Sequence, residues 1–290
     1  MDIYDVAIIG GGPAGLSAAV TCGVRNKKMI LFDSGGFSAK LKKAQSVKNY
    51  LGFPEISGTE LMNQFLEHAR EYQPTIITEK VVFAATAKQG FDLGTANTFY
   101  KAKTVILATG GMTATLLPGE KELLGRGVSY CATCDGHFFK GKIVAVILDG
   151  LENPSDLEFL SEICARVLVF SKKELQTSFV ASNVEFKIEN IKKIVGSLKV
   201  EGIEGAQDRY PVDGVFIFRE SDPVDALFAG IELQGKSVAV QADLATNIPG
   251  VFAAGDCTGY PWQISRATGE GLVAALSAVK YLAEQKTSKE

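Results

Sequence analysis

The sequence predicts an α/β fold with two domains, and three observations support this. The chain has 290 residues, which exceeds a typical single domain and allows each of two domains to bury its own core. A short apolar strand at residues 4–9 runs into the glycine-rich turn GGGPAG and then into an Ala-rich amphipathic helix. A second apolar strand, residues 143–147, is placed to carry a nucleotide on the loop that follows it.

Composition and charge exclude several classes of protein. The formal net charge of −3 and the pI near 5.6 argue against a nucleic-acid-binding protein, which would be strongly basic. The apolar run at residues 6–9 breaks into glycines after a few residues, which fits neither a signal peptide nor a membrane span. We therefore expect a cytoplasmic protein that binds neither nucleic acid nor membrane.

The turn after the first strand reads G-x-G-x-x-G in the context that a dinucleotide site requires. Gly10 suits the tight turn, Gly12 lets the backbone approach a pyrophosphate, and Gly15 lets the helix pack on the strand. The helix N-terminus then offers amide donors and a positive dipole to phosphate. The next strand, residues 28–32, ends in Asp33, which can accept hydrogen bonds from both ribose hydroxyls.

The cysteines point to thiol chemistry at one place in the chain. Of the five cysteines, only Cys131 and Cys134 are closely spaced, and such a pair in a reducing compartment is typical of a catalytic dithiol. A helical N-terminus at this motif would lower a thiolate pKa. The alternatives are an idle pair or half of a zinc site, for which His137 is the one nearby candidate ligand; we expect no metal. We expect the remaining cysteines to be small buried hydrophobic residues: Cys22, Cys164 and Cys257.

Further stretches resemble one known family along nearly the whole chain. In order, they are GGGPAGLSAA, VKNYLGFPEISGTELM, AKTVILATGG, VSYCATCDG, VDGVFIF, IPGVFAAGD and GEGLVAALSAVKYL. The chain resembles the low-molecular-weight thioredoxin reductases. The resemblance implies two Rossmann-like nucleotide-binding-type domains and a homodimer. Residues 1–114 and 245–290 would form an FAD domain that is split in sequence, and residues 115–244 an inserted NAD(P)H-type domain that carries the redox pair.

The resemblance also assigns the cofactor and its ligands. The cofactor is FAD; Asp256 would hold its ribityl and pyrophosphate region, Asn49 would lie near the flavin ring, and Lys40 stands where the family usually has glutamine. The expected FAD-binding residues are Gly10, Gly12, Pro13, Ala14, Gly15, Asp33, Lys40, Asn49, Val82, Thr109, Gly110, Gly255, Asp256, Gln263 and Ile264.

The same resemblance gives the redox pair its roles. Cys131 and Cys134 would cycle between disulfide and dithiol, with Cys134 nearer the flavin C4a and Cys131 attacking the partner disulfide. Asp135 would act as general acid and base. His137 replaces an aromatic residue that is common in the family, and we expect it to lie at the surface or pack rather than to relay protons.

The second nucleotide loop departs from the family pattern. Where the family has Gly-x-Gly-x-x-Ala, this chain reads Leu148-Asp149-Gly150-Leu151-Glu152, whose side chains would fill and acidify the pyrophosphate site. Two like charges about 4 Å apart repel by ~1 kcal/mol in water and by more when partly buried. The His-Arg-Arg cluster that binds the NADPH 2′-phosphate is replaced by VFSKK at residues 169–173, whose two lysines could still meet a phosphate. We interpret the inserted domain as degenerate; the alternative is a functional, divergent loop.

A further departure lies near the expected flavin site. The family has an Arg-Gln pair after its Gly-Asp turn, whereas residues 257–264 read CTGYPWQI. Tyr260 or Trp262 could cover the flavin face that nicotinamide would otherwise use, since either ring stacks well on a flat ring system. The alternative is ordinary packing or a dimer contact.

These departures resemble the ferredoxin-dependent flavin thioredoxin reductases. The predicted function is electron transfer from reduced ferredoxin through FAD and the cysteine pair to thioredoxin. Lys40, Lys42, Lys43 and Lys48 form a local basic cluster that could attract an acidic ferredoxin, or could simply be a solvated loop. One alternative is an NAD(P)H-dependent thioredoxin reductase with a divergent nucleotide loop. A second is a non-catalytic flavin-binding regulatory protein, but the intact cysteine motif argues against this second alternative.

Overall fold

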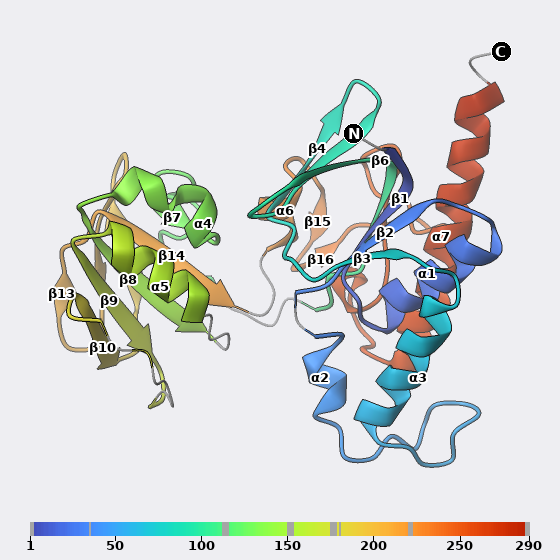
Figure 1. Cartoon of the computed structure of the whole chain (residues 1–290), viewed down its shortest axis with the longest axis horizontal. Coiled ribbons are helices and arrows are strands. Elements are labelled where there is room, and N and C mark those ends of the chain that lie inside the picture. Colours follow the sequence, from blue (N-terminus) through green and yellow to red (C-terminus); the bar gives the residue numbers. More distant parts are fainter. Residues whose placement is uncertain are drawn as a thin grey trace. The chain divides into compact units, whose positions relative to one another are not determined.

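The computed structural model describes residues 3–34, 36–111, 116–149, 154–174, 179, 181–219 and 223–287 (Figure 1). The chain divides into two compact units, which are described separately. Unit 1 comprises Met1–Met112 and Pro223–Glu290, and unit 2 comprises Thr113–Asp222. The α/β fold and the splitting of the first domain in sequence are therefore confirmed.

Unit 1 is built on a mainly parallel sheet. Its parallel strands lie in the order β3 (Thr75–Ile77), β2 (Met29–Phe32), β1 (Ile3–Ile9) and β6 (Phe99–Leu107), and β17 (Val251–Ala253) also pairs with β6. The antiparallel strands β5 (Gly90–Gly94) and β4 (Phe83–Ala87) extend the sheet beyond β6. Parallel strands are typically buried on both faces, and β2 has the expected run of four buried residues, MILF.

Helices cover one face of this sheet. The helix α1 (Pro13–Val24) packs against α7 (Ile264–Thr287) and α3 (Gly58–Arg70) (Figure 1). The α1–α7 contact is close because both helices present small side chains, among them Ala18 and Ala278, which are fully buried. The Ser57 hydroxyl accepts a hydrogen bond from the Glu60 amide at 3.2 Å and so caps the start of α3.

The second boundary of unit 1 lies earlier than the expected residue 245. Residues 223–244 contain α6 (Val224–Leu227), β15 (Leu233–Gln234) and β16 (Ser237–Val238). Their apolar side chains join the core on the other face of the unit 1 sheet, where Phe228 lies edge-on to Phe91 with ring centroids 5.7 Å apart. The segment belongs to unit 1 because its hydrophobic residues are buried in the core of that unit. The sequence of such short strands does not show which of two domains they pack against.

Unit 2 has its own parallel sheet, in the order β10 (Val184–Ile188), β9 (Arg166–Ser171), β8 (Ile143–Asp149), β14 (Gly214–Arg219) and β7 (Val128–Ser129). One face packs on α4 (Ala132–Asp135), the short η1 (Gly136–Phe139) and α5 (Pro154–Ile163). The other face contacts an antiparallel sheet of β11 (Lys193–Gly196), β12 (Val200–Glu204) and β13 (Arg209–Tyr210). Within the described residues, no helix is both long and apolar enough to cross a membrane.

The α1–α7 contact gives a prediction about stability. A Cβ on Gly271 would lie 2.1 Å from the Ala14 carbonyl oxygen, so Gly271→Ala should destabilise unit 1 by roughly 1–3 kcal/mol through overpacking. Gly269 is the matched control, since a Cβ there meets nothing within 4 Å. Gly269→Ala should stabilise α7 by about 1 kcal/mol, because alanine favours helix over glycine. Urea unfolding at saturating FAD measures both, and equal stabilities of the two variants would contradict the prediction.

Candidate functional site

The glycine-rich turn between β1 and α1 has the geometry of a phosphate cradle. Gly10 has φ +113°, and a Cβ there would lie 2.1 Å from the Ala108 carbonyl oxygen. A Cβ on Gly15 would lie 1.8 Å from the Gly10 oxygen, so both positions exclude any side chain. Gly12 caps the N-terminus of α1, followed by Pro13, and a Cβ there meets nothing within 4 Å. The open space therefore lies where a pyrophosphate would approach the helix amides.

Asp33 holds the turn from the end of β2. Its side chain is nearly buried; Oδ2 accepts from the Gly11 amide at 3.0 Å and Oδ1 from the Phe37 amide at 2.7 Å. Each carboxylate oxygen has a second lone pair, so the group can still accept from ribose hydroxyls. Asp33 therefore both shapes the turn and offers acceptors to a nucleotide.

Two other predicted FAD ligands, Thr109 and Gly110, follow the carboxyl end of β6, whereas Val82 lies beside its amino end. The Thr109 hydroxyl oxygen is buried and has no hydrogen-bond partner among the described residues, which fits a site that a cofactor completes. Gly110 has φ +78° with open space beside it. Val82 lies just before β4, and its amide donates to the Gly94 oxygen at 2.8 Å. The residues present thus fit a bound FAD, while their individual assignments stay predictions.

The structure brings Lys40, Asp256 and Trp262 together in unit 1. Lys40 Nζ lies 3.1 Å from Asp256 Oδ2 and 4.8 Å from the centroid of the Trp262 ring. A Cβ on Gly111 would lie 3.3 Å from Asp256 Cβ and 3.6 Å from Trp262 Cε2. Tyr260, in contrast, is 87% exposed. Of the two aromatic residues left open by the sequence, Trp262 is the one beside the predicted cofactor ligands.

The loop that carries Asp256 and Trp262 is held by two charged residues that sequence reasoning missed. Arg266 bonds the Gly259 oxygen, lies 2.9 Å from Thr258 Oγ1, and pairs with Glu270 at 2.8 Å. Glu270 in turn accepts from the Gly255 amide at 2.8 Å. The sequence does contain a signal for this contact: an arginine and a glutamate four residues apart in the first turns of α7, where such side chains can pair.

Asn49 and Gln263, far apart in sequence, also meet in unit 1. Asn49 Nδ2 donates to Gln263 Oε1 at 2.9 Å, and Ile264 begins α7 next to it. The side-chain amides of Asn49 and Gln263 were both predicted to bind FAD. Their hydrogen bond shows that the two predicted ligands lie next to each other.

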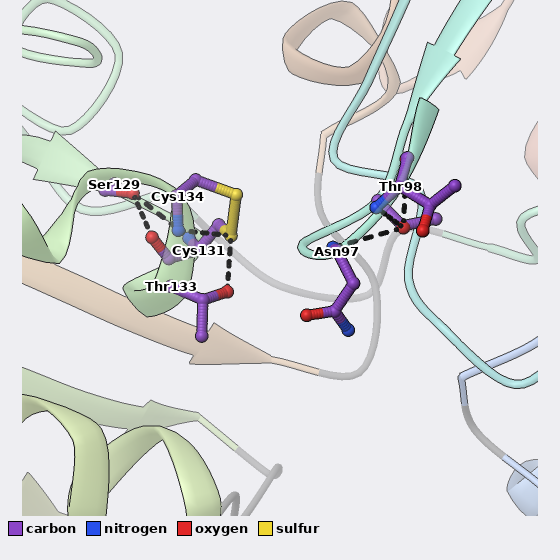
Figure 2. Close-up of a disulfide and its surroundings, with 7 residues drawn as sticks. Asn97, Thr98, Ser129, Cys131, Thr133 and Cys134 are labelled. Carbon is purple, nitrogen blue, oxygen red and sulfur yellow. Dashed lines mark hydrogen bonds between the residues drawn. A yellow bond between two sulfur atoms is a disulfide. The ribbon is translucent and has the colours of Figure 1, made fainter. Parts of the chain in front are cut away.

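The cysteine pair lies at the start of α4 in unit 2. Cys131 and Cys134 form a disulfide, with Cα atoms 5.4 Å apart. Cys131 is the N-cap residue, and its Sγ accepts from the Cys134 amide at 3.2 Å. Ser129 Oγ accepts from the Cys131 amide at 3.0 Å and donates to the Cys131 carbonyl at 3.1 Å (Figure 2). In the dithiol form, the Cys134 amide would favour a thiolate at Cys131.

The residues that follow the pair have distinct surroundings. Asp135 ends α4 and is partly buried. His137 is exposed and lies edge-on to Phe159 of α5, with centroids 5.3 Å apart, as expected for a packing residue. Among the described residues, no group of three His, Cys, Asp or Glu side chains is placed to hold a metal ion.

The other cysteines are buried and chemically inert. Burial raises the thiol pKa of Cys22 and of Cys257 to about 12 and that of Cys164 to about 11. Since the thiolate is the nucleophile, these thiols are unreactive at neutral pH. The expectation that they are small buried residues is confirmed.

The carboxyl edge of the unit 2 sheet lines a small pocket, and the charged side chains in it pair with one another. Leu148 is buried, and Asp149 Oδ1 accepts from Lys172 Nζ at 2.9 Å. Asp149 Oδ2 also lies 3.9 Å from Arg219 Nε. Lys172, one of the two lysines that could have bound a nucleotide phosphate, thus pairs with a carboxylate of its own domain. Gly150, Leu151 and Glu152 lie outside the described residues.

The basic cluster of unit 1 is partly neutralised. Lys40 pairs with Asp256, Lys42 Nζ donates to the Gly36 carbonyl at 2.5 Å, and Lys48 lies 3.3 Å from Glu55. The surface is therefore less basic than the sequence suggests.

Comparisons with known proteins agree with the geometry. The family model for pyridine nucleotide-disulphide oxidoreductases matches residues 4–147 and 157–271. The thioredoxin reductase of Bacillus subtilis is 33% identical over 99% of this chain and 98% of its own length. That of Listeria monocytogenes is 31% identical over 99% and 97%. A crystal structure of a ferredoxin-flavin thioredoxin reductase from Clostridium acetobutylicum is 40% identical, covers 99% of this chain and 100% of its own, and has a TM-score of 0.90.

The predicted resemblance is thus confirmed, and with it FAD as the cofactor. The chain belongs to the low-molecular-weight thioredoxin reductases, flavoprotein oxidoreductases of the pyridine nucleotide-disulphide oxidoreductase family that carry a redox-active disulfide.

Proposed function

We propose that this protein transfers electrons from reduced ferredoxin, through FAD and the Cys131–Cys134 pair, to the disulfide of thioredoxin. The observation that carries the choice of donor is the carboxyl edge of β8 in unit 2. Leu148 and Asp149 are the last residues of β8, at the place where the family's glycine-rich turn begins, and Asp149 is bonded to Lys172. A pyridine nucleotide would have to break this pair and place its pyrophosphate beside a carboxylate. The likeness to the ferredoxin-flavin enzyme of Clostridium acetobutylicum supports the same choice.

FAD supplies the conversion between a one-electron donor and the two-electron chemistry of a disulfide. In this chain Gly12 would face its pyrophosphate, Asp33 a ribose, and Asp256 the ribityl region. Thr109 offers the hydroxyl that has no partner among the described residues.

The reduced cysteine pair then carries out disulfide exchange. The Cys131 thiolate attacks one sulfur of the thioredoxin disulfide, which forms a mixed disulfide and releases a thioredoxin thiolate. Asp135 gives this thiolate its proton. Asp135 next takes the proton of Cys134, and the Cys134 thiolate attacks the Cys131 sulfur. This restores the Cys131–Cys134 bond and releases the second thioredoxin thiolate, which receives that proton from Asp135. Two electrons and two protons have passed to thioredoxin.

Trp262 would cover the flavin face that nicotinamide needs in relatives that use NADPH. Its contacts with Lys40 and its position beside Asp256 and Gly111 support this over Tyr260. A flat indole stacks well on a flavin ring. The side chain would therefore add a second barrier to nicotinamide, independent of Asp149.

The same proposal includes a cytoplasmic homodimer. The helix α7 exposes Leu272, Val273 and Leu276, which are 45%, 37% and 37% exposed. An apolar stripe of this kind supports burial against a second copy.

The donor is tested by flavin absorbance under strict anaerobiosis. Reduced ferredoxin should bleach the oxidised flavin band, and added thioredoxin disulfide should restore it. Millimolar NADPH or NADH should leave the band unchanged, because the Asp149 carboxylate at the end of β8 would repel the pyrophosphate. Dithionite is the control for a reducible flavin. Rapid, saturable bleaching by NADPH would overturn the proposed donor and support the NAD(P)H-dependent alternative.

The two cysteines should behave differently when each is replaced by serine. Cys131→Ser should abolish thioredoxin reduction while FAD stays bound and reducible by ferredoxin, because only the attacking thiol is lost. Cys134→Ser should accumulate a mixed disulfide between Cys131 and thioredoxin, visible on non-reducing gels. Failure of the second variant to capture thioredoxin would remove Cys131 as the nucleophile.

Flavin fluorescence distinguishes the two aromatic residues. An indole in contact with the flavin quenches its emission, so Trp262→Ala should brighten the bound FAD. Tyr260→Ala is the control and should not, since Tyr260 is 87% exposed. Bound FAD is quantified after protein precipitation. If the Trp262 variant is no brighter than wild type, the residue does not cover the flavin.

A further inference from the structure

A buried ion pair in unit 2 is joined to the residue that precedes the redox pair. Glu120 and Arg219 are 0% and 2% exposed, and they form a two-pronged contact with N···O distances of 2.5 and 3.2 Å. The Tyr130 hydroxyl donates to Glu120 Oε1 at 2.7 Å, and the Leu117 amide donates to Oε2 at 2.9 Å. Tyr130 is the residue directly before Cys131.

These contacts make the carboxylate of Glu120 a rigid anchor. Burial costs an ion its hydration, so a buried pair persists only with good geometry and further hydrogen bonds. Glu120 has both, since each oxygen accepts from Arg219 and from one other donor. Burial alone would lower the pKa of Arg219, but its hydrogen bonds to Glu120 raise the pKa overall, so the guanidinium stays charged. The guanidinium carbon also lies 5.7 Å from the centroid of the Tyr130 ring.

The short strand β7 and the residue after it, Tyr130, are held by two sets of contacts. The strand β7 pairs with β14, with Ser129 opposite Phe216, and Arg219 lies at the end of the same β14. The backbone is thus fixed at Ser129 and the Tyr130 side chain at Glu120. From there the chain enters the turn in which the Cys134 amide lies 3.2 Å from Cys131 Sγ.

The other end of this network reaches the carboxyl edge of the unit 2 sheet. Arg219 Nε lies 3.9 Å from Asp149 Oδ2, and Asp149 pairs with Lys172. In open parallel sheets, ligands bind outside the carboxyl ends of the strands, and β8, β9 and β14 all end here. The charges that fill this edge are therefore continuous with the contact on Tyr130.

We propose that Tyr130 is a positioning residue for the redox reaction, and that the Glu120–Arg219 pair holds it in place. This rests on the assignment of Cys131 as the attacking thiol. The stabilisation of a Cys131 thiolate depends on the direction of the Cys134 amide, because a hydrogen bond weakens steeply with misalignment. Without the Tyr130 hydroxyl, the peptide before Cys131 loses its side-chain tether, this bond weakens, and less Cys131 is ionised at neutral pH.

The test compares Tyr130→Phe with the same change at Tyr210. The Tyr210 hydroxyl also donates to a carboxylate of unit 2, Glu189 Oε2 at 2.6 Å, but it is not adjacent to the cysteine pair. Each holoprotein is reduced and treated with iodoacetamide, from which a thiolate displaces iodide to form a thioether. Mass spectrometry then gives the alkylation rate at each cysteine across a pH series.

Tyr130→Phe should slow alkylation of Cys131 at neutral pH by about threefold or more and move its pH midpoint upwards, because only the thiolate reacts. Its flavin should still be reduced by the electron donor at the wild-type rate. Tyr210→Phe should match wild type. A merely structural role for Tyr130 would not shift the pH midpoint.

Two results would overturn the proposal, and each would reject a different part of it. If Cys131 reacts with the same pH profile in all three proteins, the positioning role of Tyr130 is wrong and the assignment of Cys131 stands. If Cys134 is the first to be alkylated in the wild-type protein, the assignment of Cys131 itself fails, and the role of Tyr130 with it.

Discussion

Direct contact between backbones at the glycine turn is the constraint on which unit 1 depends. Gly10 lies against Ala108, and Gly15 against Gly10, so closely that a Cβ at either position would overlap a carbonyl oxygen. This contact sets the position of α1, and α1 in turn sets that of α7, whose Gly271 touches Ala14. At Gly12, between these two glycines, a Cβ would meet nothing within 4 Å. The FAD cradle is thus a product of packing as much as of phosphate chemistry.

Unit 2 uses the same type of sheet with the opposite outcome at its carboxyl edge. Where unit 1 leaves glycines and a buried Thr109 hydroxyl without a partner among the described residues, unit 2 places Asp149, Lys172 and Arg219, which bond with one another or with Glu120. At this edge a negatively charged ligand would meet the Asp149 carboxylate, which repels it, and a lysine that already pairs with that carboxylate. The difference between a cofactor domain and a carrier of the disulfide therefore lies in a few side chains at the ends of equivalent strands.

The sequence predicted those features that depend on local pattern. The glycine turn, the strand that ends at Asp33 and the cysteine pair each lie within a short segment, so spacing alone indicated their geometry. Residues that meet across long separations were not predictable in this way: Glu120 and Arg219 are far apart in the chain, and nothing local shows that both are buried. The boundary at residue 223 was missed for the same reason, since Phe228 joins unit 1 through contacts with residues distant in the chain, such as Ala84 and Phe91.

Ion pairing also bears on selectivity between electron donors. A small diffusible donor such as a nicotinamide must enter a fitted site, so the paired charges of Asp149 and Lys172 would act on it directly. A protein donor has no such requirement, because it needs only a surface near the flavin and a favourable long-range field. The pairing of Lys40 with Asp256 and of Lys48 with Glu55 weakens that field. Under the proposed function, docking of ferredoxin on this surface would rely on contact as well as on charge, and the exposed Tyr260 offers apolar area for it.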